Sequence, residues 1–147
     1  MEEVRGVIGH VEQDGLPVLY RYIDEAPSDE KRAQLPWLTV IAWAYDGSSR
    51  NGMPPVDVNA RMVDLEERIE TGVEALGFCE HTVSKTGNGL KELVYYIHDR
   101  ETFSERLNAA LDGQPRYPID IAFYHDPEWQ DLALTRSIFD GAPSREL

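Results

Sequence analysis

The chain has 147 residues, a usual length for one domain, and 41% of them are hydrophobic, as in a folded globule rather than a disordered acidic chain. Its 14 Lys and Arg stand against 27 Asp and Glu, which gives a formal net charge of -13. Such a surface repels phosphate backbones and anionic lipid headgroups, so we expect no direct binding of nucleic acid or membranes. It would attract a basic protein, although an acidic excess that serves only solubility is the competing interpretation.

Cysteine content and the N-terminal sequence bear on the cellular compartment. Cys79 is the only cysteine, so no intramolecular disulfide can form, as is usual in a reducing cytoplasm. The first residues include two acids and no basic segment leading into a long apolar run, unlike a secretory signal. No apolar run approaches the ~20 residues needed to span a bilayer. We therefore expect a soluble, cytoplasmic protein, with a homo-oligomer left open.

The first third of the chain is predicted to contain two strands. Residues 1–14 are weakly patterned and form either a short strand or a loose arm. Alternating side chains predict a strand over Leu16–Asp24, and the polar segment Glu25–Gln34 after it is predicted to be an exposed loop. Leu35–Tyr45 is almost continuously apolar, which is typical of a strand in the middle of a sheet.

A long helix is predicted after the loop Gly47–Pro55, which is rich in Gly and Pro. It spans Asp57–Leu76 and ends at Gly77, a residue typical of a helix C-terminus. Apolar residues recur along it at three- and four-residue spacings and form one stripe. The stripe is expected to face the core and consists of Met62, Leu65, Ile69, Val73 and Leu76.

The segment Phe78–His98 is predicted to be a β-hairpin, because Asn88-Gly89 is the dipeptide preferred in a two-residue type I′ turn. This turn places Lys85 opposite Glu92. Opposite charges facing each other across two strands favour that register.

Two helices and one strand are predicted in the last third. Arg100–Leu111 forms a helix and Tyr117–His125 forms the last strand. Asp126 then caps the final helix with its carboxylate, and Pro127 takes the first helical position. As a cap, Asp126 should be replaceable by Asn or Ser with almost no loss of stability.

From Leu35 onward the order of elements is β-α-β-β-α-β, the ferredoxin-like pattern. The predicted fold class is therefore α+β, a ferredoxin-like βαββαβ core with a mainly antiparallel sheet, one strand added before it and one helix after it. We expect the added strand at a sheet edge. Without internal repeats or low-complexity tracts, residues 1–147 are expected to form a single domain, with an arm over 1–14, the folded domain over 15–139 and a tail over 140–147.

One set of residues in the predicted hairpin could hold a metal ion. The register sets Cys79 directly opposite His98 and places His81 two residues along on the same face. A thiolate and two imidazoles are ligands for zinc or a similar ion. The alternative, which we favour, is a buried thiol beside hydrogen-bonded imidazoles, with no cofactor expected. No sequence motif elsewhere indicates a catalytic group, and the favoured reading is that the protein is not an enzyme.

Aromatic residues are the candidates for a docking surface. Because side chains alternate along strands, some aromatics must point away from the two main helices. An open sheet face rich in aromatics would bind a partner. The candidate binding residues are Trp37, Trp43, Tyr96, Tyr124 and Trp129. Alternatively, the final helix folds back and covers this face with Trp129 and Phe139, and we favour covering.

Several short motifs together resemble a known family. They are GLPVLYRY, LPWLTVIAWAY, the tripeptide Gly52-Met53-Pro54 before the long helix, the turn Lys85–Gly89 followed by LVYYIHD, and the final Asp126–Trp129. Over Gly15–Phe139 the chain resembles the bacterial family known as domain of unknown function 695. That family has no assigned activity, so the resemblance implies no catalytic residue. Some members are joined to domains resembling ribonuclease-activity regulator B, acidic proteins that bind an enzyme, which implies a binding role.

Two functional hypotheses follow. The first is a protein-binding regulator or inhibitor that acts on a basic partner, such as a nucleic-acid enzyme or a toxin. The second is an enzyme or a small-ligand or metal-binding protein that uses Cys79, His81 and His98. A closed polar pocket that gathers histidines and carboxylates would favour the second hypothesis. A broad acidic face with solvent-facing Trp or Tyr would favour the first.

Overall fold

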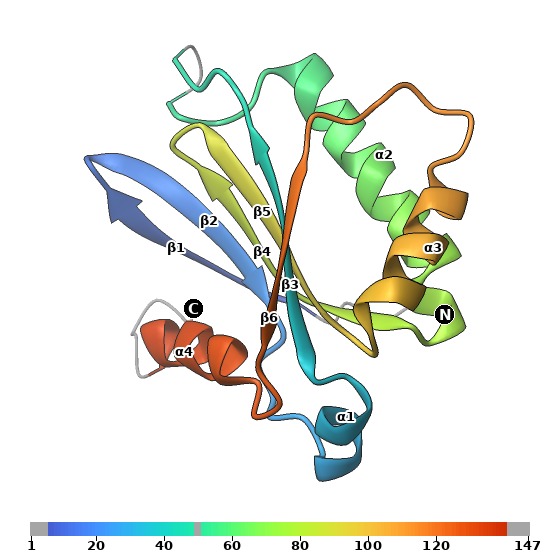
Figure 1. Cartoon of the computed structure of the whole chain (residues 1–147). Helices are drawn as coiled ribbons and strands as arrows, with labels where there is room; N and C mark the ends of the chain where they lie inside the picture. Colours follow the sequence, from blue (N-terminus) through green and yellow to red (C-terminus); the bar gives the residue numbers. More distant parts are fainter. Residues whose placement is uncertain (1–5, 49–50, 141–147) are drawn as a thin grey trace, which may run out of the picture.

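The computed structural model describes residues 6–48 and 51–140, which form a mixed α/β fold with a six-stranded antiparallel sheet and four α-helices (Figure 1). The strands follow the sheet order β1 (Val7–Gln13), β2 (Leu16–Tyr22), β4 (Cys79–Gly87), β5 (Leu90–Ile97), β3 (Trp37–Ala44) and β6 (Asp120–His125). The helices are α1 (Asp29–Gln34), α2 (Val56–Gly72), α3 (Arg100–Ala110) and α4 (Gln130–Phe139). Of the tail expected over residues 140–147, all but Asp140 lies outside the described residues, as do residues 1–5 of the expected arm.

The central position expected for the apolar strand is confirmed. β3 pairs antiparallel with β5 on one side and with β6 on the other. Its side chains are buried on both faces of the sheet, with Ile41 and Trp43 in the core on one face and Leu38 in the core on the other. A strand that packs against a core on both faces requires apolar residues at successive positions, which explains the unbroken run in the sequence.

The strand added before the core does not lie at the sheet edge. β2 pairs with both β1 and β4, and the edge strand is β1. Asp14 and Gly15 join β1 to β2 with φ values of 56° and 79°, as a tight hairpin turn of type I′ requires. The weakly patterned arm therefore contains a strand, and this strand takes the edge position predicted for its neighbour.

A short helix occupies part of the expected loop over Glu25–Gln34. The hydroxyl oxygen of Ser28 accepts a hydrogen bond from the backbone N–H of Lys31 (3.1 Å), which caps α1. The prediction of a loop is therefore wrong for Asp29–Gln34. The polar composition correctly indicated an exposed segment. The signal for a helix in it was Ser28, a residue type that caps helix N-termini.

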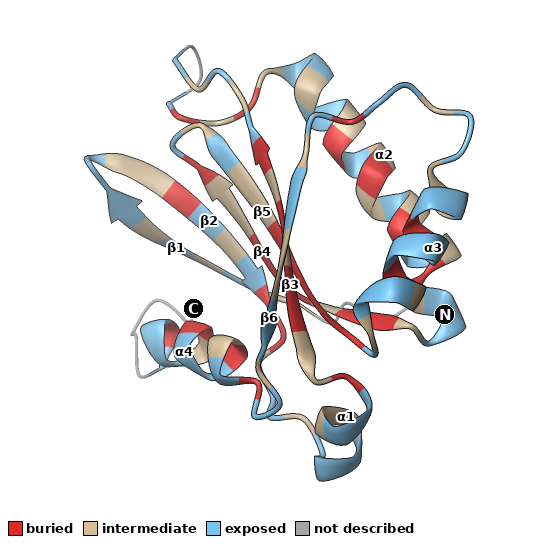
Figure 2. Ribbon diagram, in the orientation of Figure 1, coloured by how far each residue is buried: buried red, intermediate tan, exposed pale blue. Residues whose placement is uncertain are grey.

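Helices α2 and α3 cover one face of the sheet, and Figure 2 shows buried positions on their inner sides and along the central strands. The predicted stripe on α2 faces this core through Met62, Leu65 and Ile69, and Val73 after the helix is also buried. Leu76 is a correction, since 57% of it is exposed. The α-helix ends at Gly72 and a 3-10 turn over Glu74–Leu76 rotates the last stripe residue out of line.

Helix α4 covers the opposite face of the sheet, as the favoured alternative predicted (Figure 1). The Trp129 ring stacks on the Tyr96 ring with centroids 4.1 Å apart, and its indole N–H donates to the carbonyl oxygen of Leu35 (2.9 Å). At the other end of α4, the Phe139 ring stacks on the Tyr22 ring at 5.1 Å. The two aromatics thus fix both ends of the helix to the sheet.

The start of α4 differs from the prediction. The helix begins at Gln130 instead of Pro127, and Trp129 before it has a φ of 55°. The Asp126 carboxylate nevertheless accepts the backbone N–H groups of Gln130 (2.9 Å) and Asp131 (3.1 Å). It satisfies helix N–H groups as expected of a cap, across a turn of irregular backbone.

Asp126→Asn is expected to lower the free energy of unfolding by about 1–3 kcal/mol, because three donors share two oxygens. The third donor is the Tyr96 hydroxyl, 2.6 Å from the oxygen that also accepts the Asp131 N–H. An asparagine has one acceptor oxygen, so its amide group must face a donor. Urea unfolding followed by circular dichroism measures the loss. If the Asn variant matched the wild type, as capping alone would predict, the Tyr96 contact would have no energetic role.

Candidate functional site

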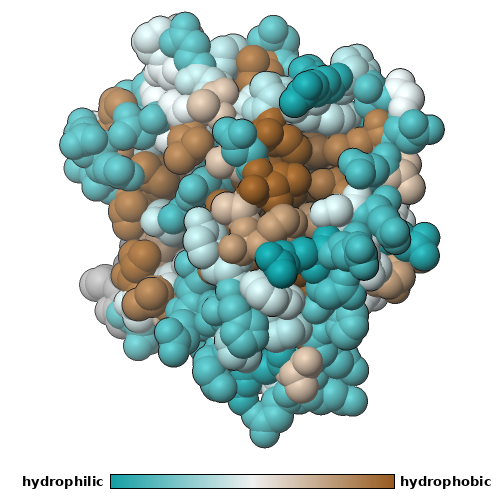
Figure 3. All heavy atoms as spheres, in the orientation of Figure 1, coloured by the Kyte–Doolittle hydropathy of each residue, from teal (hydrophilic) through white to brown (hydrophobic). Residues whose placement is uncertain are grey.

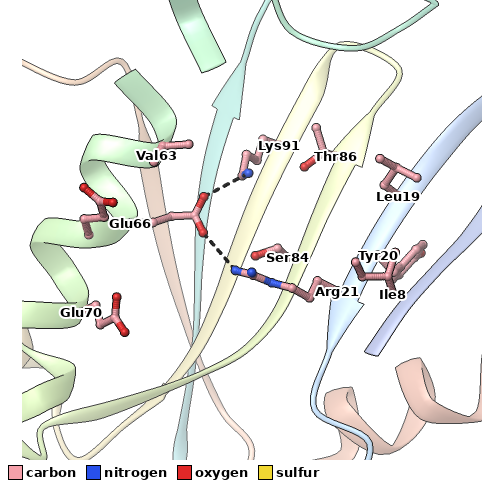
Figure 4. Close-up of a pocket in the computed structure, with 11 residues that line it drawn as sticks. Ile8, Leu19, Tyr20, Arg21, Val63, Glu66, Glu70, Ser84, Thr86 and Lys91 are labelled. Carbon is pink, nitrogen blue, oxygen red and sulfur yellow. Dashed lines mark ion pairs between the residues drawn. The ribbon is translucent and has the colours of Figure 1, made fainter. Parts of the chain in front are cut away.

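A groove of about 400 Å³ separates helix α2 from the β1–β2 hairpin on the α2 face of the sheet (Figure 4). Its residues come from β1, β2, α2, β4 and β5. They are Ile8, Leu19, Tyr20, Arg21, Val63, Glu66, Glu67, Glu70, Ser84, Thr86 and Lys91.

Strand and helix periodicity explain why these residues meet. On α2, Val63 precedes the three glutamates of the groove by three, four and seven positions, which places all four on one helix face. Leu19 and Arg21 lie two apart on β2, and Ser84 and Thr86 lie two apart on β4, so each pair shares one sheet face.

The charges of the groove are arranged around Glu66. Its carboxylate lies 3.6 Å from the Arg21 guanidinium and 3.1 Å from the Lys91 ammonium, and Figure 4 shows it reaching from α2 toward the sheet between the two cations. Glu67 and Glu70 are exposed on the same helix face, and no ion pair holds either carboxylate within the described part of the chain. The groove therefore keeps two carboxylates available to an incoming cation.

Below the groove, a half-buried imidazole contacts the Ser84 hydroxyl. The Nε2 atom of His81 lies 3.0 Å from Ser84 Oγ, and the ring stacks on Tyr95 with centroids 4.5 Å apart. Burial lowers the pKa of His81 to about 4, against the opposing effect of the nearby Glu66. The ring is therefore neutral at physiological pH and a weak base, which makes it a poor partner for activating a serine.

The register that supported a metal site is wrong. Cys79 pairs with Ile97 instead of His98, because a β-bulge between His81 and Val83 shifts the pairing by one residue. Nδ1 of His98 lies 2.9 Å from the carbonyl oxygen of Gln34. Over residues 6–48 and 51–140, no group of three or more His, Cys, Asp or Glu is placed to hold a metal ion. Burial also raises the pKa of the Cys79 thiol, which keeps it protonated.

The candidate docking aromatics separate into two groups. Trp43, Tyr96 and Trp129 are buried in the two cores and offer no contact surface. Trp37 is half-buried beneath the Arg100 guanidinium at 4.5 Å from the ring centroid, and it lies beside His125. Tyr124 is the exposed member, with 54% of it accessible. Strand alternation placed aromatics on both faces correctly but could not show which of them α4 covers.

A second cleft, of about 340 Å³, lies on the opposite face of the sheet beside α4. Its apolar part consists of Leu38, Val40, Val83 and Val94. Its polar part consists of Lys85, Glu92, Tyr124, Asp131 and Thr135. In Figure 3, hydrophobic side chains gather in the middle of the molecule, where β6 lies in Figure 1, and hydrophilic side chains surround them.

Together these features define a mixed α/β domain with an antiparallel sheet, with the groove on one face of the sheet and the cleft on the other. The chain belongs to the family described as "Family of unknown function (DUF695)", whose model matches residues 11–133. The comparisons with curated proteins and with solved structures gave no match. Among the helices in the described ranges, none has the length and apolar character to span a bilayer.

Proposed function

We propose that this chain is a cytoplasmic protein-binding regulator or inhibitor of a basic partner, and that the partner contacts the groove beside α2. The proposal rests on apolar side chains that stand in solvent next to uncommitted carboxylates. Ile8 is 74% exposed, Leu19 is 44% exposed and Val63 is 43% exposed. Glu67 and Glu70 lie beside them on α2.

The two kinds of group have different roles in such a contact. Burying the apolar side chains provides affinity, at about 25 cal/mol per Å² of apolar surface removed from water. The carboxylates and the net charge of -13 steer a basic surface toward the groove and suppress acidic competitors. Glu66 is already neutralised by Arg21 and Lys91, so it shapes the groove floor. The best occupant is a segment with Lys or Arg side chains near an apolar residue.

We further infer that the segment from β3 to β6 is a ferredoxin-like unit. The sheet order β4-β5-β3-β6 supports this, because each helix connection then passes over one intervening antiparallel strand. The alternative of an enzyme or metal protein built on Cys79, His81 and His98 has less support, since the bulge removes the register that joined them.

A charge-reversal pair tests the groove. The variant Glu67→Lys/Glu70→Lys changes the groove, and Glu101→Lys/Glu105→Lys makes the same change in net charge on exposed positions of α3. We expect the wild type to capture a basic protein from the native host in a salt-sensitive manner. Surface plasmon resonance with that protein, identified by mass spectrometry, should then show at least a tenfold weaker affinity for the groove variant alone.

The other outcomes are equally informative. Equal loss in both variants would show that the overall charge, instead of the groove, attracts the partner. Full retention of binding in the groove variant would place the contact elsewhere. If no protein were captured in a salt-sensitive manner, the regulatory role itself would be wrong.

A further inference from the structure

We propose that the cleft beside α4 binds an alkyl cation, with an ammonium or guanidinium group at Asp131 and Glu92 and its apolar stem on the cleft floor. The cation is either a free small amine or the side chain of a basic protein. The cleft lies on the opposite sheet face from the groove, so this site is independent of the regulatory role proposed above.

The cleft carries more negative than positive charge. Lys85 is its one cation within the described residues, and it is held by Glu92 at 3.5 Å and lies 5.6 Å from the centre of the Tyr20 ring. Asp131 is half-buried, and no hydrogen bond or ion pair to its carboxylate is present among the described residues; its backbone N–H donates to Asp126. A half-buried carboxylate at an open cleft gains a charge-assisted hydrogen bond when a bound cation donates to it.

The apolar floor determines the rest of the ligand. Leu38, Val40 and Val94 line the cleft, so the bound cation must carry an apolar stem. Tyr124 at the rim is largely exposed and offers an aromatic face, which attracts cations. A volume of about 340 Å³ is at the small end of ligand sites, which fits an alkylamine or one basic side chain. A ligand with its own carboxylate is disfavoured, because Lys85 is already paired.

The titration of Asp131 supports the proposal. Burial raises the pKa of Asp131, the neighbouring Asp126 and Glu92 raise it further, and Lys85 opposes them. Tyr124, from β6, also lines the cleft. A cation prefers the ionised carboxylate, so affinity should be full at high pH and should fall as the pH drops through this raised pKa. Groups with perturbed titration in a cleft are candidates for function.

The test is a titration of the ¹⁵N-labelled full chain with n-butylguanidinium, followed by NMR. We expect saturable shifts confined to the cleft-lining parts of β3, β4, β5, β6 and α4. We also expect no saturable shifts with n-butanol, and weaker binding of free arginine, which carries a carboxylate. N-acetyl-arginine N-methylamide represents a partner's side chain. Binding of both guanidinium probes with similar affinity indicates that the cleft accepts the side chain of a protein. Binding of n-butylguanidinium alone indicates that the ligand is a free small cation.

Variants decide whether the cleft is responsible. Asp131→Asn should weaken binding at least tenfold, and Tyr124→Ala, at an exposed position, should weaken it severalfold. Glu105→Gln removes one exposed carboxylate from α3, outside the cleft and the groove, and should leave the affinity unchanged within about twofold. The absence of saturable shifts, shifts outside the cleft, or equal weakening by Glu105→Gln and Asp131→Asn would each overturn the site.

Discussion

Ile69→Ala should lower the free energy of unfolding by about 2–5 kcal/mol, the range for deleting a large buried aliphatic side chain. Ile69 has no exposed surface and packs in the core with Leu65, Tyr95 and Phe103. The substitution removes apolar burial and leaves a cavity that a β-sheet and two helices cannot collapse fully. Urea unfolding followed by circular dichroism gives the change, with an unaltered m value as the sign of two-state behaviour.

Leu76→Ala is the matched control for that substitution. Both residues belong to the apolar stripe that the sequence predicts for one helix, but Leu76 is 57% exposed. Its truncation should therefore change the free energy of unfolding by no more than about 0.5 kcal/mol. Equal costs for the two variants would mean that the helix continues to Leu76 and buries it, contrary to the 3-10 turn found there.

Sequence patterns predicted those elements whose structure depends on residues that are close together in the chain. The apolar run of β3 and the Asn88-Gly89 turn predicted their elements correctly, and the stripe on α2 predicted the helix but extended it past its end at Gly72. Close to that turn, the register is also correct, and Lys85 forms the expected ion pair with Glu92 at 3.5 Å. Farther along the same hairpin the register fails, because a bulge beside Thr82 adds a residue and has no simple sequence signal.

The candidate site was much less predictable. Its apolar wall combines Ile8 and Leu19 from the hairpin with Val63 from α2, and these meet only because the sheet brings β2 alongside β4. The sequence prediction placed β2 at a sheet edge, and for that reason the contact between the hairpin and α2 could not be predicted. Alternation did indicate that Leu19 and Arg21 share a face, but it could not show that α2 would lie opposite them.

Trp129→Ala should lower the free energy of unfolding by about 3–5 kcal/mol, the typical cost of deleting a buried aromatic ring. Trp129 is only 2% exposed, stacks on Tyr96 at 4.1 Å, and donates its indole N–H to the Leu35 carbonyl. Alanine removes the stack and leaves that carbonyl without its donor. The backbone of Trp129 also has a φ of 55°, a conformation that costs free energy in any residue but Gly. The contacts of the indole ring maintain this conformation.

Trp129→Phe separates the stack from the hydrogen bond. Phenylalanine keeps an aromatic ring against Tyr96 but has no N–H for Leu35, so its cost should be about 1–3 kcal/mol, that of one unsatisfied buried acceptor. Equal losses for the Phe and Ala variants would assign the whole effect to the hydrogen bond. Hydrogen exchange adds a local measurement. In the Ala variant, α4 amides should lose protection while those of α2 retain it, since α2 packs in the other core.

That difference between the helices links stability to function. Asp131 is in the first turn of α4, so loosening this helix should abolish alkyl-cation binding in the cleft. The groove on the other face contains no residue of α4, so binding of the proposed basic partner there should persist. If the Ala variant lost both activities while remaining folded, the two faces would be coupled, and the independence of the two sites would be wrong.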